Sequence, residues 1–371
     1  MAELPKVVVV LGAGASFDSW NGQVPRVEGW QPPTAAQLFS YRSTFWEVLE
    51  RYPGAKFLQS ALGPLSASGA IKIEEKLSEY ARGDDETRRH FKEVPLYIRD
   101  VIYGASTKYL PSSGTGTYAH FVSRLLSERE HRVMFLSLNY DTLLEQAIEL
   151  ARPKLAIGSV QDYVDPSRGV SVVKVHGSVN WVRSMGRVTR AGANWDRHFE
   201  TFDPLRNTDI YLHDVGENSR GATFDADEAR WWAYPAITAP VAGKSGRFVC
   251  PDTHTDALRE FTTNCRKYLF VGTSGLDEDV LTFMAQHVPS GSFASYVGSG
   301  SDAKVAAKRI DDAVPAFRED FYRHTVWDDG FAAFAGSDEF DQFLRWPPAE
   351  EDIEQFRSQY GNPRPLTSKE I

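Results

Sequence analysis

The chain has 371 residues and carries 41 Lys and Arg against 50 Asp and Glu, which gives a formal net charge of −9 at pH 7. This length allows one large or two modest domains, and a composition that is 42% hydrophobic and 25% charged is ordinary for a soluble globular protein. The acidic balance argues against a broad basic face, so we expect no direct binding to nucleic acid.

The sequence also argues against a secreted, membrane-bound or zinc-dependent protein. Its two cysteines, Cys250 and Cys265, cannot form a four-cysteine zinc site within one chain and do not indicate a disulfide framework. No apolar run approaches the ~20 residues that span a bilayer. The N-terminus lacks the basic and then apolar pattern of a signal peptide. We therefore expect a cytoplasmic protein with no zinc and no membrane partner.

The first element is a run of β-branched and apolar residues at 7–11, which is typical of a buried parallel strand. Gly12 and Gly14 follow directly, and glycines at this place let the backbone turn sharply and approach a phosphate. The third glycine of the full dinucleotide fingerprint is absent, because Phe17 stands there. Alone, the pattern fits a tight strand-to-helix turn without a ligand equally well.

A long helical stretch separates this strand from the next. Residues 17–33 are rich in Gly, Pro and Trp, and we expect an irregular loop that covers a ligand, although a surface excursion would have the same composition. Thr34 is expected to cap the first helix. Apolar residues then recur at helical spacing, so the sequence predicts a helical insertion at 34–130.

The remainder of the chain alternates strands and helices. Residues 183–235 are polar and aromatic and are expected to form an irregular insertion, followed by a short strand at 236–238. Residues 311–371 are too rich in aromatic side chains for a disordered tail, so we expect them to pack on the core or on a neighbouring subunit, with a frayed end at 361–371. The other expected strands are 132–138, 170–175, 268–271 and 295–298, and the other expected helices are 142–151, 255–266 and 276–286.

Four of the expected strands end in small or polar residues. The alternation predicts an α/β fold with a Rossmann-like parallel sheet, whose core consists of 1–33 and 131–310. In such a sheet, ligands bind outside the carboxyl ends of the strands, so the four groups are expected to face one crevice. They are Gly12, Ala13, Gly14 and Ser16; Asn139 and Asp141; His176; and Gly272, Thr273 and Ser274.

Taken in this order, the four groups resemble the motif set of the sirtuins. The chain is most similar to the sirtuin-like domains of bacterial anti-phage defence proteins, through the sequences at 139–145, 174–178 and 272–279. The resemblance implies NAD as the ligand. It places Asn139 and His176 at the nicotinamide ribose, as the residues expected to act in catalysis. The residues expected to bind NAD are Gly12, Ala13, Gly14, Ser16, Asp141, Gly272, Thr273 and Ser274.

Two departures from the deacylating sirtuins decide between the functions that the family offers. The four-cysteine zinc module is missing, and the helical insertion is unlike the small helical module of those enzymes. We therefore expect an NAD glycohydrolase that forms ADP-ribose and nicotinamide and depletes NAD during infection. The family implies a homo-oligomer and, as a partner encoded alongside, a ring-forming DNA-translocase-type ATPase. The alternatives are an NAD-dependent protein deacylase and a non-enzymatic module that binds NAD or ADP-ribose.

The chemistry assigns roles to the three polar residues at the strand ends. Cleavage of the nicotinamide–ribose bond passes through an oxocarbenium-like state, and the leaving group needs no general acid. His176 is expected to accept a proton from a ribose hydroxyl or from water, and the Asn139 carboxamide is expected to orient the water. Asp141 is expected to anchor the loop or the substrate, or to begin the next helix.

The remaining polar candidates have simpler interpretations. Asp277 and Asp279 are expected to begin a helix, where negative charge suits the helix dipole. His213 and His254 are expected to be surface groups. The two cysteines are expected to be structural.

Overall fold

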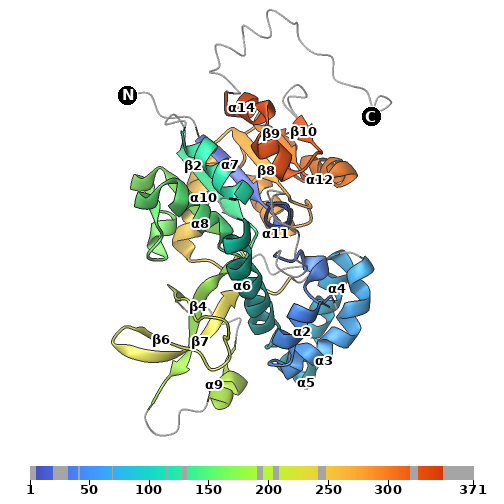
Figure 1. Cartoon of the computed structure of the whole chain (residues 1–371), viewed down its shortest axis with the longest axis vertical. Coiled ribbons are helices and arrows are strands. Elements are labelled where there is room, and N and C mark those ends of the chain that lie inside the picture. The colour runs from blue at the N-terminus through green and yellow to red at the C-terminus, as the bar shows by residue number, and fades with distance from the viewer. Residues whose placement is uncertain are drawn as a thin grey trace, which may run out of the picture.

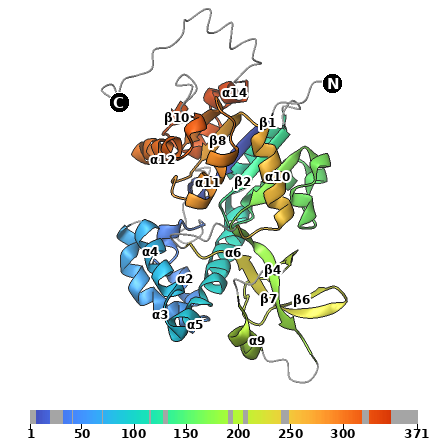
Figure 2. The same ribbon diagram turned by 180° about the vertical axis from the view of Figure 1, so that it is seen from behind.

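The structure is a computed structural model that describes residues 6–19, 32–40, 42–68, 70–113, 116–127, 132–189, 195–203, 209–240, 248–317 and 325–345. Its strands form two separate sheets, one parallel and one antiparallel. In Figures 1 and 2 the parallel sheet and its helices occupy one end of the molecule. The antiparallel sheet and a group of helices lie at the other end, on either side of helix α6.

Six parallel strands form the larger sheet, in the order β10-β9-β8-β1-β2-β3. Counted along the chain within this sheet, the strands follow the order of the doubly wound dinucleotide-binding fold, with the first strand beside the second and the fourth. The predicted α/β class with a Rossmann-like parallel sheet is confirmed. The strands are β1 (Lys6–Leu11), β2 (Arg132–Ser137), β3 (Val170–Lys174), β8 (Lys267–Val271), β9 (Phe293–Val297) and β10 (Thr325–Trp327).

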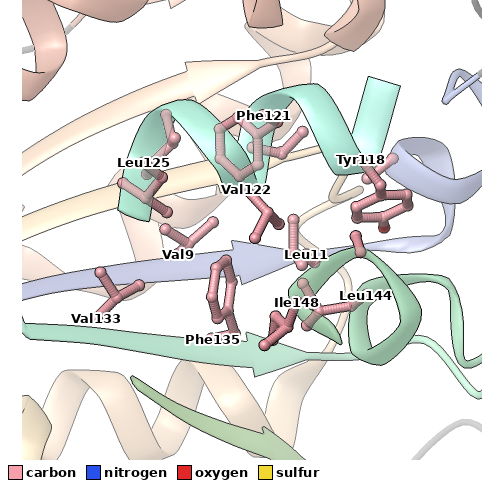
Figure 3. Packing of buried hydrophobic residues seen from close by; sticks show 14 of the residues in the cluster. Val9, Leu11, Tyr118, Phe121, Val122, Leu125, Val133, Phe135, Leu144 and Ile148 are labelled. Atoms are coloured by element: carbon pink, nitrogen blue, oxygen red, sulfur yellow. The ribbon is translucent and has the colours of Figure 1, made fainter. Parts of the chain in front are cut away.

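Helices cover both faces of this sheet because its strands are apolar on both sides. Val7 and Val9 are buried in the hydrophobic cluster on one face, and Val8 and Val10 in the cluster on the other. Figure 3 shows side chains of α7 and α8 packed on β1 and β2. The first face is covered by α7 (Gly116–Ser127), α8 (Leu143–Ala151), α13 (Phe331–Ala335) and α14 (Asp338–Arg345), and the second by α10 (Asp252–Thr263), α11 (Glu278–His287) and α12 (Gly300–Ala313).

The helical stretch after β1 divides between the two ends of the molecule. Its last helix, α7, packs on the parallel sheet through Phe121 and Leu125, whereas the earlier helices contribute to a second hydrophobic core. Thr34 caps the first turn through reciprocal bonds with Gln37, as its position predicted. The earlier helices are η1 (Ala35–Gln37), α2 (Ser43–Leu49), α3 (Pro53–Leu62), η2 (Gly63–Ser68), α4 (Ala70–Ala81), α5 (Asp85–Phe91) and α6 (Val94–Ser113).

The expectation that residues 183–235 are irregular is wrong, because they contribute most of a four-stranded antiparallel sheet of order β5-β4-β7-β6. The pairing of β4 with β7 shifts register twice, which interrupts the regular alternation that would reveal strands in the sequence. Trp232 and Tyr234 of this sheet are buried in the same core as Leu96 and Tyr97 of α6. The elements are β4 (Gly177–Arg187), α9 (Trp195–Thr201), β5 (Ile210–Leu212), β6 (Thr223–Ala226) and β7 (Ala229–Ile237).

The described part of the aromatic C-terminal region packs on the parallel sheet. β10 pairs with β9 at the edge of the sheet, and Phe331, Phe334 and Phe340 are buried in the same cluster as the side chains of α7. The expected frayed end at 361–371 lies outside the described residues. No helix in the described ranges is long and apolar enough to cross a bilayer. The remaining short elements are α1 (Ala13–Phe17), η3 (Pro153–Leu155), η4 (Gln161–Tyr163), η5 (Pro166–Arg168) and η6 (Pro315–Phe317).

Candidate active site

A cavity of about 840 Å³ lies at the carboxyl ends of the parallel strands, where the turns after β1 and β8 meet. The strand order reverses between β1 and β8, and this reversal point is the usual place for a ligand in an open parallel sheet. All of the residues predicted from the strand ends line the cavity. They are Gly12, Ala13, Gly14 and Ser16; Asn139 and Asp141; His176; and Gly272, Thr273 and Ser274.

The turns after β1 and β8 lie directly against each other. Gly272 has a φ of +60°, and a Cβ atom there would come within 2.1 Å of the Ala15 nitrogen. A Cβ atom on Gly12 would come within 2.5 Å of the Gly272 carbonyl oxygen, which accepts a hydrogen bond from the Gly14 nitrogen at 3.0 Å. The two turns can pack this closely only because glycine stands at these positions.

Asn139, two residues after the end of β2, ties the turn after β1 to helix α7. Its Nδ2 donates to the Gly12 carbonyl at 2.9 Å and to Ser16 Oγ at 3.0 Å. The buried hydroxyl of Tyr118, which sequence reasoning missed, lies 3.2 Å from the same Ser16 Oγ. Asn139 Oδ1 is buried and has no hydrogen-bond partner within the part of the chain that the structure describes. An unsatisfied buried oxygen is costly, so Oδ1 is suited to accept a hydrogen bond from a bound molecule.

His176 stands where the chain leaves the parallel sheet for the antiparallel one. The next residue, Gly177, has a φ of +83°, and a Cβ atom there would lie 1.8 Å from the Ala236 carbonyl oxygen. The chain can therefore make this turn only with glycine. His176 lines the cavity, and its Nε2 is bonded to the carboxylate of Asp277.

Asp277 is a second site residue whose role sequence reasoning missed. It does begin α11 as expected, because its Oδ1 accepts a hydrogen bond from the Val280 nitrogen at 3.2 Å. Its other oxygen meets His176, which is 101 positions away in the sequence. A helix-capping signal is local and carries no information about such a distant partner.

A buried lysine supports the loop that carries Asn139. Lys174 Nζ donates to the backbone carbonyl of Asp141 and, at 2.8 Å, to Glu145 Oε1. Asp141 Oδ1 accepts from the Leu143 nitrogen at 3.1 Å, which fits the expected role at the start of the helix. Burial raises the pKa of Asp141, and the positive charge of Lys174 opposes this shift. A lysine within an apolar strand was the only signal for this group in the sequence.

The described residues that line the cavity include many carboxylates but only one Lys or Arg side chain, that of Arg309. Arg309 Nη1 donates to the Ser274 carbonyl at 3.1 Å, beside Thr273. This balance favours positive charge near the carboxylates and leaves backbone amides and one guanidinium to hold an anion. The carboxylates belong to Asp18, Glu74, Glu75, Asp141, Asp277, Glu278 and Asp302.

Residues 133–237 match the family model of the SIR2-like domain. This part of the chain is therefore similar to SIR2-like domains. It contains Asn139, Asp141 and His176, whereas the glycine turns after β1 and β8 lie outside the matched range. No curated protein matches the chain.

Solved Sir2 structures are similar to the chain at low identity. A mutant Sir2 homologue in complex with ADP-ribose is 13% identical, with a TM-score of 0.40, and the alignment covers 85% of this chain and 93% of the homologue. A Sir2 homologue in complex with NAD is 12% identical, with a TM-score of 0.34, and covers 85% and 91% of the two chains.

Part of the cavity wall comes from the helical insertion. Thr34, Ile71 and Glu74 of the helical insertion line it. The expected ligand-covering loop at 17–33 is described only at its two ends, which also line the cavity, and residues 20–31 lie outside the described ranges.

The expectation of a surface position is wrong for His254. This residue of α10 is completely buried beside the rings of Tyr163 and Trp181, and its Nε2 donates to the Val160 carbonyl at 2.9 Å. Burial lowers its pKa to about 4, so the ring is neutral at pH 7. His213 is half-buried.

Both cysteines are free thiols, with Cys265 buried and Cys250 half-buried. Burial raises the pKa of Cys250 to about 11 and that of Cys265 to about 12. Neither thiol is therefore activated as a nucleophile. The described residues also include no cluster of His, Cys, Asp and Glu that could hold a metal ion.

Proposed function

We propose that the chain binds NAD in this cavity and hydrolyses it to ADP-ribose and nicotinamide. The observation that carries the proposal is the meeting of Asn139 and His176 with the two glycine turns at the reversal point of a dinucleotide-type sheet. The SIR2-like match over the segment that contains both polar residues supports NAD as the dinucleotide. The phosphates lie along the turns after β1 and β8, and the nicotinamide ribose lies at Asn139 and His176.

The reaction breaks the bond between C1′ of the ribose and N1 of nicotinamide. The electron pair of this bond passes to the pyridinium nitrogen, which becomes neutral, so the leaving group needs no proton. Positive charge develops on the ribose, and the carboxylates of the cavity stabilise it. A water oxygen then bonds to C1′, and the water proton passes to a base and finally to solvent.

His176 and Asn139 supply the base and the hydrogen-bond acceptor that this step needs. The imidazole of His176 is the base that accepts the proton from the attacking water or from a ribose hydroxyl. Asn139 Oδ1, which is fixed because Nδ2 is bonded to Gly12 and Ser16, accepts a hydrogen bond from the water or from the ribose. Asp141 and Lys174 hold the loop on which Asn139 stands.

We further propose that the activity depletes NAD in the cytoplasm during phage infection. The motif resemblance to anti-phage sirtuin-like domains supports this role, and it is an argument by analogy. The same analogy supports a homo-oligomer and a ring-forming DNA-translocase-type ATPase, encoded alongside, as the partner that triggers the reaction.

The test is to incubate the purified full chain with NAD, alone and together with the protein encoded beside it, and to measure released nicotinamide. Asn139→Ala and His176→Ala are each expected to lower the rate by about 10²-fold or more. The matched controls are Asn264→Ala and His213→Ala, which change the same residue types outside the lining of the cavity and are expected to keep the rate.

The other outcomes separate the alternatives. Nicotinamide release that requires an acylated peptide would establish a deacylase and overturn the proposal. NAD that binds but stays intact under every condition would establish a binding module instead.

A further inference from the structure

The contact between His176 and Asp277 joins two loops that line the cavity. His176 comes from the turn between β3 and β4, whereas Asp277 ends the loop that starts at Gly272 and also lines the cavity. The side chains are only 8% and 14% exposed, so little water competes for the bond. A bond between an imidazole and a carboxylate under these conditions is strong.

The carboxylate of Asp277 cannot turn freely. Its Oδ1 is held by the Val280 nitrogen at 3.2 Å, and its Oδ2 meets His176 Nε2. The positive end of the α11 dipole also favours the ionised form of a carboxylate at this place. Asp277 therefore presents a fixed acceptor to one nitrogen of the His176 ring.

We propose that Asp277 is a positioning residue that holds the proton of His176 on Nε2 and thereby makes Nδ1 the basic nitrogen. The catalytic consequence rests on the proposed NAD hydrolysis. In that step a water O–H bond breaks, its proton bonds to Nδ1, and the water oxygen bonds to C1′ as nicotinamide leaves with the electron pair. The carboxylate stabilises the imidazolium that forms, as an orienting group does in other base-assisted reactions.

A simple capping role is the competing explanation for Asp277, and two substitutions separate the roles. In Asp277→Asn the capping oxygen remains, because Asn caps helices as well as Asp does. The group that faces Nε2 then becomes an NH2 donor, which favours a ring with its proton on Nδ1 and its lone pair on Nε2. Asp277→Ser also keeps a capping oxygen, but its side chain is too short to reach the ring.

The control is Asp84→Asn, which makes the same change at another helix N-cap. Asp84 caps α5 through a 2.9 Å bond from the Thr87 nitrogen and lies outside the lining of the cavity. If the effect of Asp277→Asn came from the helix end alone, Asp277→Asn would change the stability by as much as Asp84→Asn does. It would then also lower the rate of nicotinamide release no further than Asp84→Asn does.

The decisive measurement is the ¹⁵N chemical shift of the ring nitrogens in full-length protein with labelled histidine. The His176 signals are assigned from their absence in His176→Gln among the 9 histidines of the chain. We expect the proton on Nε2 in the unchanged protein and its loss from Nε2 in Asp277→Asn, where an amide donor faces that nitrogen. We also expect kcat for nicotinamide release to fall by about 10²-fold in both Asp277 variants, with KM within about twofold.

Two results would overturn the inference: a ring that keeps its proton on Nε2 in Asp277→Asn, or an unchanged kcat in either Asp277 variant. The ring signals do not depend on turnover. If the unchanged protein releases no nicotinamide, the proposed function fails, and the ring signals still decide whether Asp277 fixes the tautomer of His176.

Discussion

The packing of the two glycine turns predicts a large penalty for Gly272→Ala. The residue has a φ of +60°, and the new Cβ atom would lie 2.1 Å from the Ala15 nitrogen and 2.4 Å from the Gly14 carbonyl carbon. Both of these neighbours are backbone atoms, so no side chain can turn away to make room. The turns after β1 and β8 would have to separate.

Two costs add at this position. A residue other than glycine in the left-handed region costs about 1–2 kcal/mol. Overpacking against atoms that cannot move aside typically costs another 1–3 kcal/mol. The expected loss is about 2–5 kcal/mol, which is a large part of the about 5–15 kcal/mol that stabilises a typical protein. Gly221→Ala isolates the first cost, because Gly221 has a φ of +73° and open space around its Cβ position.

Urea unfolding of the two variants measures both terms, provided that the denaturant dependence m stays the same. The difference between them is the clash alone, about 1–3 kcal/mol. We also expect Gly272→Ala to weaken NAD binding, because separation of the turns displaces the backbone on which the proposed phosphates lie. A Gly272→Ala protein as stable as Gly221→Ala would refute the close packing of the two turns.

Two further predictions concern buried charge. Lys174→Met leaves Glu145 buried without its cation and should lower the free energy of unfolding by about 3–5 kcal/mol. Lys174→Met combined with Glu145→Gln should recover part of this loss. Equal unfolding midpoints for Lys174→Met and the unchanged protein would contradict the prediction. The pKa of His254 falls from 6.5 to about 4 on folding, so the unfolded chain binds the extra proton between these values and stability is lost as the pH falls from 6.5 to 4. The expected loss in the free energy of unfolding is about 3 kcal/mol. Unfolding midpoints measured between pH 6.5 and pH 4 should depend less on pH in His254→Gln. An unchanged pH dependence would assign the effect to other groups.

The parallel sheet could be predicted because its signals are local and strong. The apolar run at 7–11 fits a buried strand, and the glycines after it mark where the strand ends. The antiparallel sheet could not be predicted in the same way, because β4 and β7 change register between Ser184 and Gly186. β10 was also missed, since it has only 3 residues and its side chains are largely exposed.

The residues of the candidate site also differ in whether a local signal reveals them. Asn139 and His176 could be singled out because each follows a strand closely, and strand ends of a parallel sheet converge. Asp277 and Tyr118 could not, because their roles depend on contacts with residues 101 and 102 positions away. Sequence patterns place residues on elements, whereas partners on different elements are set by how the elements pack.

The contact between His176 and Asp277 links the antiparallel sheet to a helix that covers the parallel sheet. β4 and β7 are buried together with α6 in the second core, and buried Arg99 of α6 donates to the Val179 carbonyl of β4 at 2.8 Å. Asp277 stands at the start of α11, which packs on the parallel sheet in the cluster that contains Val8 and Val10. Gly177, directly after His176, allows no other residue, because the Ala236 backbone occupies the space of a side chain. Any side chain at position 177 would therefore have to displace β7 or move His176 away from the carboxylate of Asp277.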